Sequence, residues 1–260
     1  MKSFKSLSLF AILIAAGSFA LLSDGCKKDE GGTTGGGGGN VVPITDDLFP
    51  LVAGRSFVYT GYAISTGGSA LPDSPVVYST TWLLAGPGPF PGSTIIVDST
   101  TLRHPLAGVI RVGKLLFIRK DTTTGDFDFL QTLGPFYRAF GISSTDTLRW
   151  FTVAKPSAGA SGTWTAFDST FSSPAGDVRL EIKGEMLGTV SVTDSSSSHQ
   201  AWSTYKTRTY RNIYVSGNPV VTNSTTSQLW LAVDVGPVQV HIAQDTENLG
   251  HFRVMTSKSF

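Results

Sequence analysis

The sequence predicts a mainly β protein, whose strands form a curved antiparallel meander in a half-barrel or a sandwich, with little helix. The first observation is an alternation of apolar and charged side chains over residues 177–187, which only Gly184 and Leu187 interrupt, and a period of two is typical of a half-buried strand. The second is that Gly, Pro, Asn, Ser and Thr separate short apolar segments, as turn residues do between strands. The third is a charged fraction of only 15%, so that hydroxyl side chains supply the polar faces.

Short segments of this kind recur along the chain and are the predicted strands. Closely spaced strands with turns between them predict an antiparallel meander that folds into a sandwich or an open barrel. No stretch of comparable length keeps the spacing of an amphipathic helix, so at most one short helical turn is expected, near residues 135–140. The predicted strands cover residues 56–64, 76–84, 93–103, 115–120, 127–133, 146–153, 162–167, 177–187, 189–193, 201–215, 224–233, 238–243 and 250–256.

The 260 residues carry nearly balanced charge, with 20 Lys and Arg against 19 Asp and Glu. Lys and Arg are scattered singly among Ser and Thr, so the sequence has no basic face of the kind that neutralises phosphates. A single all-β domain can run to about 200–250 residues. We therefore expect one β-rich domain over residues 46–260 and no nucleic-acid partner.

Residues 1–25 have the order of features found in a secretory signal peptide. Lys2 and Lys5 precede an apolar run from residue 7 to residue 22, and small residues follow it. A membrane-spanning helix needs ~20 apolar residues to cross ~30 Å of hydrocarbon, whereas this run is shorter and has polar breaks. A cleaved signal peptide, and hence export, is the favoured interpretation.

Cys26 is the only cysteine in the chain and directly follows this segment. Gly25 and Cys26 resemble the end of the lipobox of bacterial lipoproteins, in which the cysteine is acylated and becomes the new N-terminus. Ser23 and Asp24 depart from the aliphatic and small residues usual there. The alternative is ordinary cleavage near Ala20, which would leave a free thiol in an oxidising compartment. The resemblance implies lipidation at Cys26 by chains such as palmitate, and attachment to the membrane through them.

Residues 26–45 read as a lipidated cysteine followed by a flexible tether. Residues 31–40 are nearly all glycine, and glycine-rich chains behave as flexible coils. Residues 27–30, KKDE, resemble the short export signal of surface-displayed lipoproteins; the alternative is a solvated start to the linker. No aspartate directly follows the cysteine, which favours the outer membrane. These features predict a protein anchored to the outer membrane, and leave open whether it is displayed at the cell surface or faces the periplasm from the inner leaflet.

The folded part also resembles a loose group of bacterial lipoproteins that carry one β-rich domain after a short tether. The resemblance rests on LFPLVAGRSFVYTG, SGTWTAF, AWSTYKTRTYRNIYV and LWLAVDVGPVQV, which begin at Leu48, Ser161, Ala201 and Leu229. It implies a curved antiparallel sheet, like the half-barrel of bacterial lipoprotein carriers. It implies no catalytic residues.

No pattern in the sequence predicts a metal or cofactor site. The segment KDTTTGDFD, from Lys120 to Asp128, has the acidic residues of a candidate calcium loop. A calcium loop needs acidic or Asn ligands at its third and fifth positions and Gly at the sixth. Here these positions hold Thr123, Gly125 and Asp126. The segment is predicted to be a hairpin turn. His199 lies in a predicted polar hairpin loop, and the other histidines are isolated rather than paired as zinc ligands; these are His104, His241 and His251.

The large aromatic side chains either fill the core or line an apolar cavity. Core filling is the favoured interpretation, because a binding pocket also needs a few convergent polar groups that a sequence does not locate. The residues concerned are Tyr59, Trp82, Trp150, Trp164, Trp202 and Trp230.

Together these features predict a lipid-anchored, non-catalytic protein of the cell envelope, acting as a binding or structural module. The first alternative is a carrier that holds an apolar ligand or lipid inside a half-barrel. The second is a carbohydrate-binding or hydrolytic surface domain, and hydrolysis needs two carboxylates ~5–10 Å apart. The candidate carboxylates are Asp98, Asp126, Asp168 and Glu181, of which Glu181 is expected on a solvated face.

Overall fold

A computed structural model of the chain describes residues 42–64, 77–104, 108–193, 201–242 and 250–260. Cys26, the predicted signal peptide, most of the predicted tether and His199 lie outside the described residues. The chain divides into two compact units, Met1–Gly39 and Asn40–Phe260, and every described residue belongs to the second. In the described part no helix is long and apolar enough to cross a membrane.

The second unit is built from strands, with one α-helix and one 3₁₀ helix among the described residues. Helix α1, Gly134–Ala139, matches the predicted helical turn, and η1 spans Pro156–Ala158. The strands are β1 Ser56–Ala63, β2 Val77–Pro87, β3 Ser93–His104, β4 Gly108–Lys120, β5 Phe127–Thr132, β6 Leu148–Ala154, β7 Thr163–Ser173, β8 Gly176–Thr193, β9 Ala201–Val215, β10 Asn218–Ala232, β11 Gly236–Ile242 and β12 His251–Ser259.

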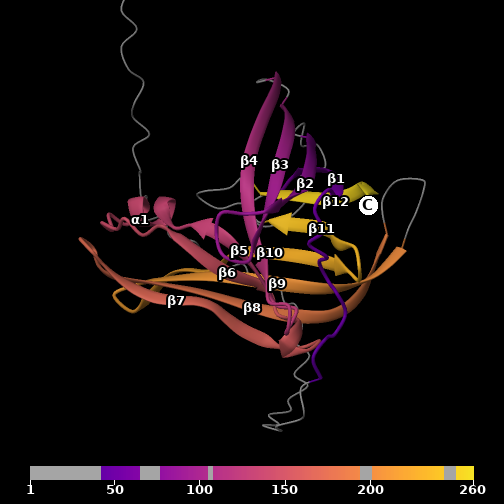
Figure 1. Cartoon of the computed structure of the whole chain (residues 1–260). Coiled ribbons are helices and arrows are strands. Elements are labelled where there is room, and N and C mark those ends of the chain that lie inside the picture. Colours follow the sequence, from indigo (N-terminus) through magenta and orange to yellow (C-terminus); the bar gives the residue numbers. More distant parts are fainter. Residues whose placement is uncertain (1–41, 65–76, 105–107, 194–200, 243–249) are drawn as a thin grey trace, which may run out of the picture. The chain divides into compact units, whose positions relative to one another are not determined.

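The described strands form one antiparallel sheet in which chain neighbours pair, with a single interruption between β6 and β7. The first strand, β1, also pairs with the last strand, β12, so that the two ends of the meander join. The sheet curls into a nearly closed barrel (Figure 1). The predicted all-β class, antiparallel meander and curvature are therefore confirmed, and the curvature brings the sheet close to closure.

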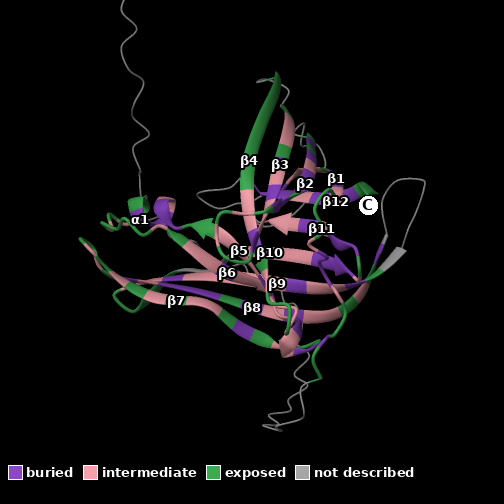
Figure 2. Cartoon of the chain, in the orientation of Figure 1, coloured by how far each residue is buried: buried purple, intermediate pink, exposed green. Residues whose placement is uncertain are grey.

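Alternation along the strands decides which side chains face the barrel interior. Buried residues alternate with more exposed ones along β2, from Val77 to Pro87, and Figure 2 shows buried and exposed stretches mixed along the strands of the sheet. On β8 the apolar positions predicted from the sequence are buried, and the charged positions between them face outward. The sequence predicts a break near residue 188, but β8 continues through it. Gly188 adopts a left-handed φ of 78°, and the register shifts there, so the residue forms a bulge instead of a turn.

Side chains close the seam between β6 and β7, which are the unpaired edges of the sheet. Trp164 on β7 donates a hydrogen bond from Nε1 to the backbone oxygen of Thr152 on β6, at 3.0 Å. The rings of Phe151 and Phe167 pack edge to face across the same seam, with centroids 5.4 Å apart. The indole of Trp164 lies over Gly184, where any Cβ would overlap it. Covering an edge in this way removes a site for unwanted strand pairing.

The segment before β1 packs inside the barrel. Leu48 and Phe49 are each only 1% exposed. The Phe49 ring contacts Phe57 on β1 and Phe127 on β5, at centroid distances of 6.1 and 5.8 Å. Because β1 and β5 are not neighbours in the sheet, this ring joins separate parts of the barrel wall. Ile44, at the end of the predicted tether, is also buried and donates its N–H to the Pro156 oxygen at 2.9 Å.

The barrel therefore has one end that is packed with apolar side chains. Phe49 sits against Gly236, where a Cβ would come within 2.8 Å of the ring. The main apolar cluster joins Leu48 and Phe49 to inward residues of several strands, among them Leu84, Ile96, Ile118 and Met255. A second apolar cluster holds Phe136 and Tyr137 of α1 against β8 and β9. The open space inside the barrel adjoins the main apolar cluster.

Candidate ligand cavity

A cavity of about 410 Å³ lies inside the barrel. This volume falls in the range of small-molecule sites, ~300–1,000 Å³. Inward-facing residues of most strands line it, so it belongs to the barrel interior and not to a surface loop. The lining residues are Trp82, Asp98, Lys114, Leu116, Phe129, Leu130, Gln131, Thr132, Val153, Ile182, Thr207, Thr209, Tyr210, Arg211, Ser227, Leu229, Val240, Ile242, His251 and Arg253.

One part of the cavity wall is apolar and adjoins the packed end of the barrel. Trp82 and Val240 belong to the main apolar cluster, and Leu116, Phe129 and Leu229 pack against it. The Trp82 ring lies 6.5 Å from that of Phe129, centroid to centroid. This wall can bury an apolar group, which gains about 25 cal/mol per Å² of surface removed from water.

The aromatic residues singled out in the sequence divide between core and cavity. Tyr59 fills the core: its ring packs edge to face on Trp82 at 5.2 Å, and its hydroxyl donates to the Pro237 oxygen at 2.7 Å. Trp82 belongs to the core and also lines the cavity. Trp164 covers the seam, and Trp230 is buried beneath Lys206. Core filling is confirmed for these four residues. Trp150 is a correction: it is only half-buried and packs against Phe90 and Arg119, outside both apolar clusters. The side chain of Trp202 lies outside what the structure describes.

Asp98 is the carboxylate in the cavity wall, and its oxygens are already bonded. It is 1% exposed. Trp82 donates from Nε1 to Oδ2 at 3.0 Å, and Thr100 donates from Oγ1 to Oδ1 at 2.7 Å. The Lys114 ammonium lies 3.8 Å from Oδ2. A buried carboxylate that is paired and hydrogen-bonded in this way is stably accommodated.

Arg253 on β12 also lines the cavity, but unlike Asp98 it has a polar atom that is not hydrogen-bonded within the described part of the chain. It is 8% exposed, and its Nε has no hydrogen-bond partner among the described residues. The guanidinium lies over the ring of Tyr78, with Cζ 5.4 Å from the centroid. Burial lowers the pKa of Arg253, and the charge of Asp98 opposes this shift. Arginine nevertheless stays protonated in proteins, so a cation is held inside the barrel.

Tyr78 on β2 adds a second unused polar group beside Arg253. Its side chain is 5% exposed, and its hydroxyl has no partner among the described residues. Burial raises the pKa of Tyr78, against the opposing charge of Arg253, so the phenol is a hydrogen-bond donor at neutral pH. The ring of His251 lies 5.5 Å from that of Tyr78.

The register of three strands brings Arg253 to Tyr78. Arg253 pairs with Gly61 across β12 and β1, and Gly61 pairs with Tyr78 across β1 and β2. Gly61 has no side chain, so the space between the two is open to the guanidinium. A Cβ at Gly61 would also overlap the backbone oxygen of Phe252. Closure of the sheet between β1 and β12 is thus what assembles this pair.

The chain matches no protein-family model and no curated protein. A predicted lipoprotein of Parabacteroides distasonis ATCC 8503 is 13% identical with a TM-score of 0.42, over 82% of this chain and 99% of that chain. A predicted exported protein of Bacteroides fragilis NCTC 9343 with a YmcC-like fold is 12% identical with a TM-score of 0.42, over 83% of this chain and 100% of that chain. Conclusions about function therefore rest on this chain's own residues.

Two of the candidate carboxylates lie side by side on the outer face of the barrel. Asp168 on β7 pairs in register with Glu181 on β8, and Arg179 bonds both, at 2.6 and 3.2 Å. The hydrogen bond from Arg179 lowers the pKa of Asp168. Burial acts to raise the pKa of Glu181, but hydrogen bonds from Asn212 and Lys183 outweigh it and the pKa is lowered. Neither carboxyl has the raised pKa that a general acid needs.

Glu181 departs from the solvated position expected for it, because its partners cover it. It is on the outward face of β8 as predicted, yet it is only 5% exposed. Lys183 lies 3.1 Å away and Asn212 donates to Oε2 at 3.0 Å. The charged side chains on the outward face of this part of the sheet are therefore paired with one another.

The turn between β4 and β5 is a hairpin turn, as predicted. Asp121 accepts the backbone N–H groups of Thr123 and Thr124 at 2.8 and 3.1 Å, and Gly125 adopts a positive φ of 75°. The carboxylate of Asp126 accepts both the N–H and the hydroxyl of Ser157 at 2.9 and 2.7 Å. Both acidic side chains thus serve the local backbone and the neighbouring 3₁₀ helix.

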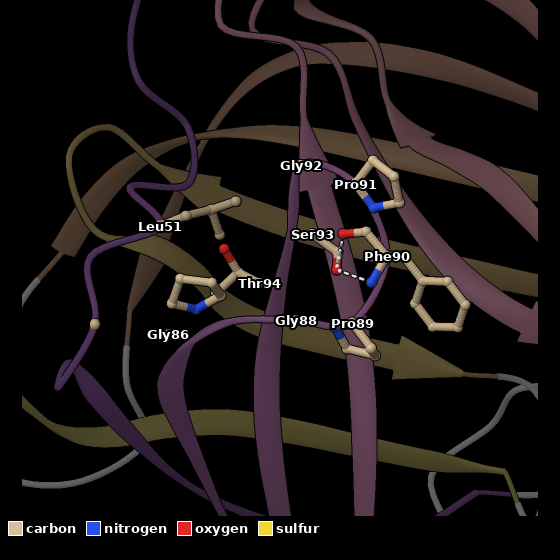
Figure 3. Close-up of a pocket in the computed structure, with 11 residues that line it drawn as sticks. Leu51, Gly86, Gly88, Pro89, Phe90, Pro91, Gly92, Ser93 and Thr94 are labelled. Atoms are coloured by element: carbon tan, nitrogen blue, oxygen red, sulfur yellow. Dashed lines mark hydrogen bonds between the residues drawn. The ribbon is translucent and has the colours of Figure 1, made fainter.

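A second hollow lies at the β2–β3 turn and differs chemically from the interior cavity. Figure 3 shows Leu51 on one side of it and Pro89, Phe90 and Pro91 on the other. Ser93 is used by the turn itself: its hydroxyl donates to the Phe90 oxygen at 2.7 Å and accepts the Phe90 N–H at 3.2 Å. None of the residues that line this hollow is ionisable. The interior cavity is therefore the better candidate site.

Proposed function

We propose that this chain is an exported, non-catalytic protein of the cell envelope that binds a small amphiphilic molecule inside its barrel. In this proposal acyl chains on Cys26 anchor the protein to the outer membrane, where it is displayed at the surface. The barrel then acts as a binding module. Its interior favours one form of that role, a carrier that holds an apolar ligand. No nucleic acid, metal or cofactor takes part.

The cavity is the observation that carries this proposal. It combines an apolar wall around Trp82 and Phe129 with polar groups that include Asp98 and Arg253. Sites for small molecules are mostly apolar with a few placed polar groups. The carboxylates on the outer face have lowered pKa values, which supports binding over hydrolysis.

Replacing Cys26 with serine is expected to move the protein from the membrane fraction to the soluble fraction. Acyl chains contribute about 0.8 kcal/mol per buried methylene, so a multiply acylated cysteine holds a domain at a bilayer almost permanently. Fractionation of cells and mass spectrometry of the N-terminus measure this. Ser23→Ala, which keeps the cysteine, is the control. An unacylated N-terminus at or near Leu21 in the wild-type protein would contradict the anchor.

Purified Cys26→Ser protein is expected to bind one molecule of a single-chain amphiphile. Native mass spectrometry, without detergent and with added dodecanol or dodecanoate, measures the bound mass. Leu229→Trp fills the cavity wall and should abolish the complex. Leu83→Trp, at an outward position that is 39% exposed, should preserve it. Absence of a bound mass with both amphiphiles would refute the binding function.

A further inference from the structure

We propose that the cavity selects amphiphiles with a carboxylate head, and that Arg253 is the residue that binds this head. The inference rests on the proposed binding function and specifies its ligand. The apolar chain lies along the wall formed by Trp82, Phe129 and Leu229, toward the packed end of the barrel.

The buried charge of Arg253 is compensated only in part, by the nearby carboxylate of Asp98. Its Nε is without a hydrogen-bond partner in the described part of the chain. The nearby carboxylate of Asp98 is taken by Trp82, Thr100 and Lys114. Buried charges in proteins are ordinarily paired or hydrogen-bonded. A ligand anion supplies the missing partner.

The donors at this place match a carboxylate. A guanidinium presents a planar fork of N–H groups that pairs with the two oxygens of a carboxylate. The ring of Tyr78 packs against this guanidinium, with its centroid 5.4 Å from Cζ, and helps to fix its position. Among the lining residues Lys114, Arg211 and Arg253 are cations and Asp98 is an anion, so the cavity favours an anionic head. A carboxylate carries one negative charge, whereas a phosphate monoester carries nearly two.

The interior changes from apolar to polar along its strands, which sets the direction of the ligand. On β12 the inward residues run from Met255 in the main apolar cluster to Arg253 and then His251. On β2 they run from Leu84 through Trp82 to Tyr78 in the same direction. A chain that enters tail first therefore meets apolar side chains at the packed end and leaves its head beside Arg253. The volume of about 410 Å³ fits a single chain.

The test compares dodecanoate with dodecanol, which share a chain and differ in the head. At a pH where the carboxylate is ionised, the Cys26→Ser protein is expected to bind dodecanoate about tenfold or more tightly than dodecanol. Arg253→Gln should weaken dodecanoate binding by about 10- to 100-fold, the usual range for a hydrogen bond to a charged group. Dodecanol binding should change less than about threefold.

Matched variants separate the carboxylate site from a general loss of structure. Arg119→Gln makes the same chemical change on the exposed outer face of β4 and should leave both affinities unchanged. Tyr78→Phe removes a hydroxyl that does not line the cavity and should leave both affinities unchanged. Arg253→Lys keeps the charge without the planar fork and should restore part of the affinity. Circular dichroism checks that each variant is folded.

The outcomes distinguish this inference from the proposed function. If neither amphiphile binds, the binding function fails and this inference fails with it. If both bind with equal affinity, or if Arg253→Gln weakens both equally, the cavity binds ligand but has no carboxylate site. Tighter binding of dodecyl phosphate than of dodecanoate would replace the carboxylate with a phosphate head.

Discussion

Phe49→Ala is expected to lower the free energy of unfolding by about 3–5 kcal/mol, the range for truncating a fully buried Phe. The ring is 1% exposed and contacts Phe57, Phe127 and Gly236 at the packed end of the barrel. These contacts come from separate strands, so neighbouring side chains have little freedom to collapse into the space. The variant therefore loses both the burial of the ring and the packing around it.

Denaturant unfolding, followed by tryptophan fluorescence, measures this change. Val52→Ala is the matched control, because Val52 lies in the same segment but is 50% exposed, and its truncation should cost less than about 0.5 kcal/mol. A loss below about 1 kcal/mol for Phe49→Ala would mean that the segment before β1 does not contribute to the core.

Arg253→Met is expected to stabilise the ligand-free protein by about 1–4 kcal/mol, the gain found when buried ionic groups are replaced by apolar groups of similar size. Methionine has nearly the length of the arginine stem, carries no charge and adapts to irregular space. The gain arises because the free protein no longer keeps out of water a cation that Asp98 compensates only in part. The same change removes the carboxylate site.

Thermal and denaturant unfolding without ligand measure the gain, and dodecanoate binding measures the loss in parallel. Arg119→Met on the outer face is the control, where the salt bridge to Asp128 is solvent-exposed and worth ~0–1 kcal/mol. Destabilisation of the ligand-free protein by Arg253→Met would show that the guanidinium supports the fold itself, and would remove the argument for a ligand anion. Greater stability together with lost binding is the pattern of a functional residue.

Local features of the fold could be read from the sequence because they depend on neighbouring residues. Alternation from Val178 to Met186 identified the two faces of β8 correctly. The residues of the 120–128 turn, with Asp121 capping backbone N–H groups and Gly125 at positive φ, identified a hairpin. Gly188 marked an irregularity, but whether a glycine makes a turn or a bulge depends on the strand that pairs with it.

The candidate site was missed because its signal is ambiguous in one strand. Along β12, alternation pairs Phe252 with Val254 on one face and His251 with Arg253 on the other. Hydrophobicity favours the first pair for the interior, yet the structure buries His251 and Arg253 there. Phe252 finds its apolar contacts elsewhere, against Tyr62 and Trp230. A lone arginine in a strand is ordinarily a surface residue, so no pattern in the sequence pointed to it.

By itself the sequence indicated most of the strands, the 120–128 turn and the mainly β class, since alternation and turn chemistry act over a few residues. It missed the first half of β4, which begins at Gly108, and the continuity of β8 through residue 188. It also carries the signs of export and of lipidation at Cys26, which lie outside the described structure. Tertiary structure alone decided that β1 joins β12, because that contact links opposite ends of the domain and follows from the curvature of the whole sheet. Only this closure sets Gly61 between Arg253 and Tyr78, and leaves a buried cation facing the cavity.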